Sequence, residues 1–230
     1  MAQTTGALFL GAAFPLGSYA KGTMSDNAND WVLTNANIDN HHAGASIGGN
    51  VGLKVNFGLG VPGLSVMLSV DGFYNGLNNN LKEYFDDKVI EMKNNQLVNS
   101  YKLSRPKYIN TPVMVGINHV IYLGSKFGLF FEGGIGCNAR FITNYNETIK
   151  YVANVTTETT YKYKPAFSFA YQLGTGFEIN EKIIIGGSFY GLGASKVYAE
   201  RKQPIVGTDS FKNAKGVRPN MFLLRLGFKF

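Results

Sequence analysis

The sequence contains little of what soluble enzymes and helical membrane proteins are built from. Its single cysteine, Cys137, excludes an internal disulfide and a cysteine-based zinc site. Charged residues make up only 16% of the chain, against roughly 25% in a typical soluble domain. No apolar run reaches the roughly 20 residues that a membrane-spanning helix needs. Helical periodicity is weak, and its best segment, residues 81–92, is polar and lies between predicted strands.

Alternation of apolar and polar residues is abundant instead. Leu64, Val66, Leu68 and Val70 share one parity, and the residues between them are mostly polar. A period of two residues is typical of strands with one apolar face, and the 28 glycines and 13% aromatic residues fit such strands. The alternation predicts an all-β fold of about eight strands, at residues 6–18, 43–60, 64–77, 108–123, 127–145, 166–180, 183–198 and 219–230.

The connections between these strands alternate in length. Short turns are expected near residues 61–63, 124–126 and 180–182, and long loops near 19–42, 78–107, 146–165 and 199–218. Short turns at one end and long loops at the other are typical of a transmembrane antiparallel up-and-down β-barrel. Such a barrel closes because an open sheet edge would leave backbone groups unpaired in lipid. We therefore expect a single domain over residues 1–230, with periplasmic turns and extracellular loops.

The alternation alone does not say which face points outward, because a soluble lipocalin-type barrel places its apolar face inside. The polar parity, however, carries charges that would spoil a hydrophobic cavity, together with glycines that leave room for long side chains. An eight-stranded lumen is filled by side chains, so we expect a charge network that plugs it, with Arg225 paired to Glu132 or Asp71 and Lys54 in the same network. The candidate interior residues are Lys54, Asp71, Glu132, Arg140, Glu178 and Arg225.

The last strand carries a resemblance to a known family. Alternating apolar residues that end in an aromatic one resemble the closing strand of bacterial outer-membrane barrels, which the barrel-insertion machinery recognises. These residues are Phe222, Leu224, Leu226, Phe228 and Phe230. Residues 111–118 and 130–136 resemble the middle hairpin of small OmpA/OmpX-like and PorT-like outer-membrane barrels.

The resemblance implies residence in a bacterial outer membrane, with its lipid and lipopolysaccharide as surroundings and the insertion machinery as a partner during assembly. Residues 1–20 lack a basic leading region and are interrupted by Gly6, Gly11 and Pro15. They are therefore interpreted as a mature end with the signal peptide absent.

Positive charge is concentrated in the last long loop of a chain whose formal net charge is +7. Such a basic rim suits contacts with anionic lipid or glycan. Nucleic acid is not an expected partner, because the basic residues are spread over loops without a recognisable binding fold. The candidate contact residues are Lys196, Arg201, Lys202, Lys212, Lys215 and Arg218.

No residue pattern indicates catalysis, a cofactor or a metal. His119 lies close to a short turn, at the wrong end for the lipid-A-modifying barrel enzymes, and the adjacent pairs His41–His42 and Asp86–Asp87 are interpreted as solvated loop residues. The sequence predicts a non-enzymatic outer-membrane protein with a structural, surface-interaction or adhesion role through its long loops. Binding or transport of a small apolar ligand or lipid is the alternative, and a lipid-A-modifying enzyme is the third hypothesis.

Overall fold

The computed structural model contains a closed eight-stranded antiparallel β-barrel, which confirms the predicted fold class. It describes residues 4–21, 43–153, 155–203, 207–212 and 216–230. The strands follow one another around the barrel in the order β1-β13-β10-β9-β6-β5-β3-β2. Their bounds are β1 (Thr4–Leu16), β2 (Gly48–Gly58), β3 (Leu64–Asn75), β5 (Tyr108–Tyr122), β6 (Phe127–Ile142), β9 (Ala166–Ile179), β10 (Ile183–Gly191) and β13 (Asn220–Lys229).

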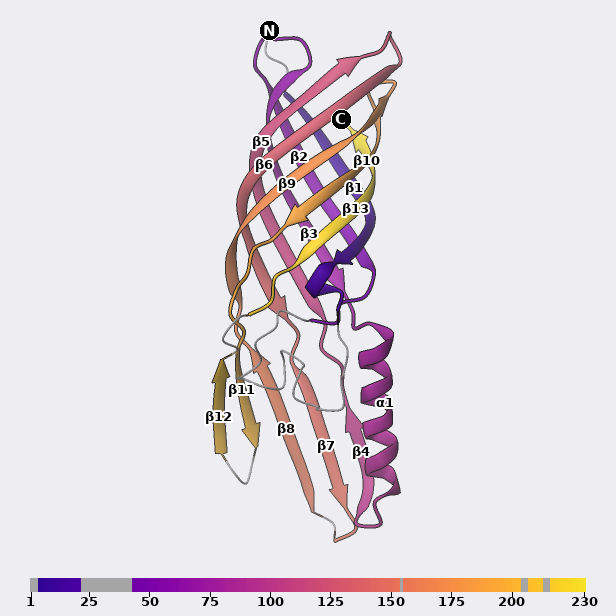
Figure 1. Cartoon of the computed structure of the whole chain (residues 1–230), viewed down its shortest axis with the longest axis vertical. Coiled ribbons are helices and arrows are strands. Elements are labelled where there is room, and N and C mark those ends of the chain that lie inside the picture. The colour runs from indigo at the N-terminus through magenta and orange to yellow at the C-terminus, as the bar shows by residue number, and fades with distance from the viewer. Residues whose placement is uncertain (1–3, 22–42, 154, 204–206, 213–215) are drawn as a thin grey trace.

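The first and last strands close the barrel. β1 pairs with β13 from Ala7 opposite Lys229 to Leu16 opposite Asn220, and β13 pairs with β10 on its other side. Every barrel strand therefore has a neighbour on both sides, which is the condition for a sheet that stands in lipid. Figure 1 shows the barrel at the top of the view, with the C-terminus at the end of β13 in its upper half.

The apolar parity points outward, which excludes the lipocalin-type alternative. The polar parity points into the lumen, where the six candidate charged residues are all buried. Within the described residues, no helix is long and apolar enough to cross a membrane. The outward apolar side chains form a belt around the barrel that includes Leu10, Leu53, Leu68, Val115, Ile135, Phe169, Leu173, Phe177, Ile185, Leu226 and Phe228.

Much of the sequence expected as long loops is regular structure, which corrects that expectation. Residues 78–107, 146–165 and 199–218 contribute a helix and strands, whereas most of residues 19–42 lie outside the described residues. The strands form a second sheet in the order β12-β11-β8-β7-β4, below the barrel in Figure 1. The elements are η1 (Gly17–Tyr19), α1 (Asn79–Asn94), β4 (Val98–Leu103), β7 (Tyr145–Tyr151), β8 (Thr156–Tyr163), β11 (Tyr198–Gln203) and β12 (Gly207–Lys212).

Helix α1 packs beside β4 at the edge of this second sheet (Figure 1). Asn78 caps its N-terminus, because the side-chain Oδ1 accepts a hydrogen bond from the Leu81 backbone N–H at 3.0 Å. Leu81 and Phe85 are buried one turn apart on the same helix face, and the Phe85 ring meets the Tyr145 ring edge-on. Tertiary packing of the aliphatic Leu81 and the aromatic Phe85 therefore holds an otherwise polar helix in place.

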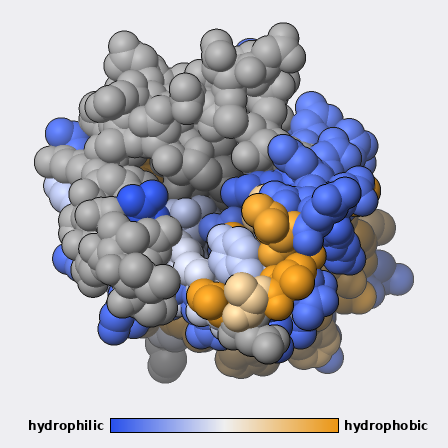
Figure 2. Space-filling model, turned by 90° about the horizontal axis from the view of Figure 1, so that it is seen from below, coloured by the Kyte–Doolittle hydropathy of each residue, from blue (hydrophilic) through white to orange (hydrophobic). Residues whose placement is uncertain are grey.

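The far end of the second sheet carries a small apolar cluster. The backbone N–H of Val152 donates to the Leu97 carbonyl at 3.0 Å, which joins the β7–β8 turn to the segment between α1 and β4. Leu97, Val152 and Val155 are all exposed there, Leu97 at 70%. Figure 2 views the molecule from this end and shows hydrophobic atoms gathered beside a hydrophilic area.

Candidate functional site

Four of the six predicted interior charges meet in the middle of the lumen. Glu132 accepts from Lys54 Nζ at 2.8 Å through Oε2 and from Arg225 Nη2 at 2.6 Å through Oε1. The same guanidinium lies 3.5 Å from Asp71 through Nη1. Two positive and two negative side chains therefore balance one another, which is the condition under which buried charges are tolerated.

Neutral side chains complete the hydrogen bonding of both carboxylates. Tyr190 donates its hydroxyl to Asp71 at 2.8 Å, and Asn50 donates to the other oxygen of the same carboxylate at 3.2 Å. Gln172 and Ser188 each donate to Glu132 at 3.1 Å. We call Lys54, Asp71, Glu132 and Arg225 with these four donors the lumen network.

Two buried aromatic rings lie in the lumen on the short-turn side of this network. Lys54 Nζ lies over the rings of Phe9 and Phe130, at 5.1 and 5.2 Å from their centroids, and the Arg225 guanidinium lies 4.8 Å from the Phe9 centroid. Both rings belong to a buried cluster with Ala7, Val120 and Ile184. The cations are thus desolvated between carboxylates and aromatic faces, an arrangement that favours a closed lumen over a water-filled one.

The other two predicted interior residues lie apart from the lumen network. Arg140, 1% exposed, donates to the backbone carbonyls of Val217 at 2.8 Å and Ser195 at 2.7 Å. Ser195 and Val217 form an isolated antiparallel β-bridge, at the point where the chain leaves the barrel for β11 and returns to it after β12. Glu178 instead pairs with Lys229 at 2.5 Å, near the short turns.

A second group of buried polar side chains lies in the lumen on the side of the second sheet. Asn138 donates to Asn110 at 3.2 Å, and Asn110 donates to the Tyr19 hydroxyl at 3.2 Å. The Tyr108 hydroxyl donates to the Ala43 carbonyl at 2.6 Å. The sequence placed Asn138 on the inward parity of β6 but did not single out these neutral residues as part of the interior network, although Asn110 has the inward parity of β5.

The second sheet has one aromatic face and one basic face. The register places Tyr145 opposite Tyr161, and Tyr163 opposite Ala199, on the face that meets α1 through Phe85. Burial raises the pKa values of the Tyr145 and Tyr163 hydroxyls. The Tyr145 and Tyr161 rings stack with 4.2 Å between centroids.

The opposite face of this sheet is rich in lysine and threonine. Cross-strand pairs place Lys102 opposite Thr148, Lys150 opposite Thr156, and Lys202 opposite Thr160. Residues that are directly opposite, or two apart on one strand, share a face. We call this surface the lysine–threonine face, and its residues are Lys102, Thr148, Lys150, Thr156, Glu158, Thr160, Lys162, Glu200 and Lys202.

The lysines of this face are exposed and outnumber its two glutamates. Lys164, just beyond β8, pairs with Glu200 at 2.8 Å, and its ammonium lowers the pKa of that carboxyl. Lys102, Lys150, Lys162 and Lys202 have no ion-pair partner among the described residues. The face therefore presents free ammonium groups and hydroxyls in rows across four strands.

The predicted basic residues are distributed over this region unevenly. Lys202 belongs to the lysine–threonine face, whereas Arg201 lies on the aromatic face opposite Tyr161. Lys196 and Arg218 are exposed close to the barrel. Lys212 lies on β12, and Lys215 falls outside the described residues. The sequence signal for Lys150 and Lys162 was their alternation with threonine, and that for Lys102 was its alternation with serine. Both patterns are typical of a strand with one basic face.

Four residues of the predicted insertion signal lie on the outward-facing parity of β13, and the fifth, Phe230, directly follows the strand. Phe222, Leu224, Leu226, Phe228 and Phe230 are exposed to the barrel exterior. Their recognition by an insertion machinery stays a prediction.

Comparison with solved structures identifies the architecture. OprG from Pseudomonas aeruginosa superposes with a TM-score of 0.50 at 15% sequence identity, over 100% of this chain and 97% of that one. The chain has the fold of bacterial outer-membrane β-barrels. This agrees with the outward apolar belt of the eight-stranded barrel.

Two other proteins with the outer-membrane barrel fold resemble the chain less closely. A major outer membrane protein from Thermus thermophilus gives a TM-score of 0.47 at 10% identity, over 99% of this chain and 100% of that one. The second is Ail, the attachment invasion locus protein of Yersinia pestis, in complex with the heparin analogue sucrose octasulfate. It gives a TM-score of 0.44 at 10% identity, over 99% of both chains. No protein-family model matches the sequence, and no curated protein matches it.

Of the residues weighed for catalysis, those that the structure describes do not come together in a site. His119 faces outward on β5 opposite Phe131, and Asp86 pairs with Arg105 on the surface. His41 and His42 fall outside the described residues. Within the described part of the chain, no three histidine, cysteine, aspartate or glutamate side chains converge as metal ligands.

Proposed function

We propose that this protein is a non-enzymatic, non-conducting barrel of the bacterial outer membrane that binds anionic glycans through the lysine–threonine face of its second sheet. In the proposed orientation, the short turns face the periplasm and the second sheet stands outside the cell. The barrel serves as the membrane anchor, and the projecting sheet serves as the binding platform.

The observation that carries this proposal is the chemistry of the lysine–threonine face. Four ammonium groups and a set of hydroxyls lie on neighbouring strands, which are about 4.8 Å apart in a sheet. A polymer of sugars that carries sulfate, phosphate or carboxylate groups offers charges and hydroxyls along an extended line. Lysine provides the point charge for such anions, and threonine hydroxyls donate to and accept from sugar oxygens.

Transport of a small apolar solute is less well supported by the same geometry. The charges of the lumen network and the rings of Phe9 and Phe130 are buried inside the barrel, which supports a plugged lumen. A lateral exit would need a gap in the strand ladder, yet β1 and β13 pair over ten positions. We therefore expect the reconstituted protein to give no steady ion conductance in a planar bilayer, and stable open channels would contradict the plugged lumen.

Binding is tested with dextran sulfate as the probe and uncharged dextran as the ligand control. Full-length protein in nanodiscs should retain dextran sulfate at low salt and release it as salt rises, because exposed ion pairs are screened. The double variant Lys162→Gln with Lys202→Gln should weaken binding at least tenfold. It removes two charges from the adjacent strands β8 and β11 of the face.

The matched control removes two lysines from the helix beside the sheet. Lys82→Gln with Lys93→Gln changes the net charge equally, and both residues lie on α1. The control should bind as the parent does. Equal losses in both double variants would mean that net charge alone attracts the polymer, and the assignment to this face would then be wrong.

A further inference from the structure

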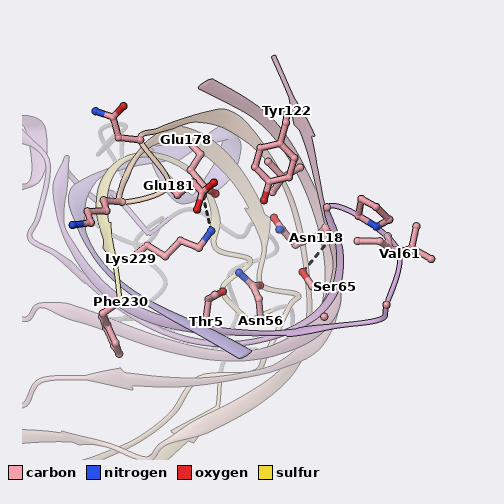
Figure 3. A pocket seen from close by; sticks show the side chains of 18 residues that line it. Thr5, Asn56, Val61, Ser65, Asn118, Tyr122, Glu178, Glu181, Lys229 and Phe230 are labelled. Carbon is pink, nitrogen blue, oxygen red and sulfur yellow. Dashed lines mark hydrogen bonds and ion pairs between the residues drawn. The ribbon is translucent and has the colours of Figure 1, made fainter. Parts of the chain in front are cut away.

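A pocket of about 590 Å³ lies at the short-turn end of the barrel, opposite the second sheet. Figure 3 shows its lining side chains, which come from strands around the rim. The volume is within the roughly 300–1,000 Å³ of ordinary small-molecule sites. It is a blind vestibule, because the buried cluster of Phe9, Val120, Phe130 and Ile184 closes the lumen beyond it.

The charges in this vestibule balance one another. Glu178 pairs with Lys229 at 2.5 Å, and the dashed line in Figure 3 marks this pair. Glu181 and Lys182 add one charge of each sign in the neighbouring turn. The pocket therefore offers no net electrostatic attraction for either a cation or an anion.

The polar groups that remain for a ligand are amides and hydroxyls. Asn118 is only 4% exposed, yet its Oδ1 has no hydrogen-bond partner among the described residues, and the same is true of Asn56 Oδ1. Both side chains lie in the pocket, with the Thr5 hydroxyl beside Asn56 in Figure 3. A buried amide oxygen without a donor lacks the hydrogen bond that it makes in water, so a ligand that brings O–H or N–H donors restores that hydrogen bond.

An aromatic ring completes the lining. The Tyr122 ring stands at the rim of the pocket in Figure 3, and half of the residue is exposed. Ser65 lies deeper and donates to the Asn118 carbonyl at 3.3 Å, which holds the β3 and β5 sides of the pocket together. Amides, hydroxyls, a neutral ion pair and one ring face form a set that suits a hydroxyl-rich molecule with an apolar ring face.

We infer that this vestibule binds a short neutral saccharide from the periplasmic side. The amide oxygens of Asn56 and Asn118 accept from the sugar hydroxyls or from an acetamido N–H. The Glu178–Lys229 pair contributes one acceptor and one donor at the opposite wall. The Tyr122 ring packs against the apolar face of one sugar ring.

The test uses the full chain in detergent micelles, titrated with N,N′-diacetylchitobiose and with maltose, both neutral, and followed by calorimetry. Saturable binding of either disaccharide is expected. Asn56→Ala and Asn118→Ala should each weaken it at least tenfold. Asn99→Ala is the matched control, because Asn99 is an exposed asparagine on β4 in the distant second sheet, and it should bind as the parent does.

Folding is followed by the faster migration of unboiled protein on a denaturing gel. If Asn118→Ala does not fold, Asn56→Ala and Tyr122→Ala, which change residues closer to the rim, decide the question. Spermidine and citrate are titrated as the cationic and anionic alternatives.

Absence of saturation with both disaccharides would overturn the inference. Disaccharide binding that neither asparagine variant weakens, or saturation by spermidine or citrate instead, would also overturn it. Because the pocket and the lysine–threonine face lie at opposite ends of the molecule, loss of dextran sulfate binding leaves this result unaffected.

Discussion

Arg225 and Glu132 lie 93 residues apart in the sequence and 2.6 Å apart in the lumen, from strands that are not neighbours in the barrel. Both side chains are at most 3% exposed. The same arginine approaches Asp71, and the same glutamate holds Lys54. This doubly shared arrangement means that neither Arg225 nor Glu132 depends on a single partner.

The first prediction concerns the stability of this pair. Arg225→Ala should lower the free energy of unfolding in detergent by about 3–5 kcal/mol, because it leaves Glu132 and Asp71 with one cation between them. The double variant Arg225→Met with Glu132→Gln should cost less than the sum of the two single changes, since Lys54 and Asp71 remain as a balanced pair. Urea titrations of the parent and these variants measure both quantities.

Lys164→Ala is the control for this cycle, because it breaks an exposed ion pair with Glu200 outside the barrel. It should leave the urea midpoint unchanged. The network would not stabilise the barrel if the losses of unfolding free energy in Arg225→Met and Glu132→Gln simply added in the double variant. The same conclusion would follow if Arg225→Ala were as stable as the parent.

The barrel and its interior charges could be predicted because the physics of a spanning strand is local. Each strand alternates lipid-facing and lumen-facing residues, so parity alone assigns Lys54, Asp71, Glu132 and Arg225 to the lumen. The partner of Arg140 could not be predicted in this way. It binds two backbone carbonyls, at Ser195 and Val217, whose position depends on how the chain leaves the barrel.

The second sheet was missed for a different reason. Its strands have few aliphatic residues, and their alternation is of threonine, tyrosine and lysine, as in Thr156–Tyr163. Such a pattern resembles a polar loop when apolar alternation is the criterion, although threonine and tyrosine favour strands. The sheet is fixed by packing between its aromatic face and α1, which no single segment of sequence reveals.

The second prediction is that Arg140 anchors the β11–β12 hairpin. Arg140→Met removes two hydrogen bonds from a charged donor, each worth about 1.5–3 kcal/mol. Proteinase K should then cleave residues 198–212 at least ten times faster, while the unboiled protein still migrates as a folded barrel. Lys202→Met, on the same hairpin but exposed, should be cleaved at the parent rate, and equal protection of Arg140→Met would contradict the anchoring role.

The third prediction concerns Cys137, which is free and exposed on the outer face of β6. Its ladder partners Val113 and Phe169 are exposed apolar residues of the barrel exterior. In liposomes the thiol should react slowly with a charged maleimide because lipid covers it. Asn99→Cys in a Cys137→Ala background places a thiol on the exposed second sheet and should react rapidly. Comparable rates at the two positions would mean that this part of β6 does not face lipid.

The last prediction is an alkaline transition confined to the second sheet. Burial raises the pKa values of Tyr145 and Tyr163 above the value of about 10 that they have in an unfolded chain. As pH rises through about 10, the unfolded state therefore loses these protons before the folded state does, and the stabilisation that is fully present below that pH declines. Proteinase K cleavage within residues 145–163 should accelerate above that pH. Tyr145→Phe with Tyr163→Phe keeps the stacked rings but removes both ionisable groups, so its cleavage rate should depend less on pH. Tyr151→Phe, at the other end of β7, should keep the parent profile, and a double variant as alkali-sensitive as the parent would assign the transition to other groups.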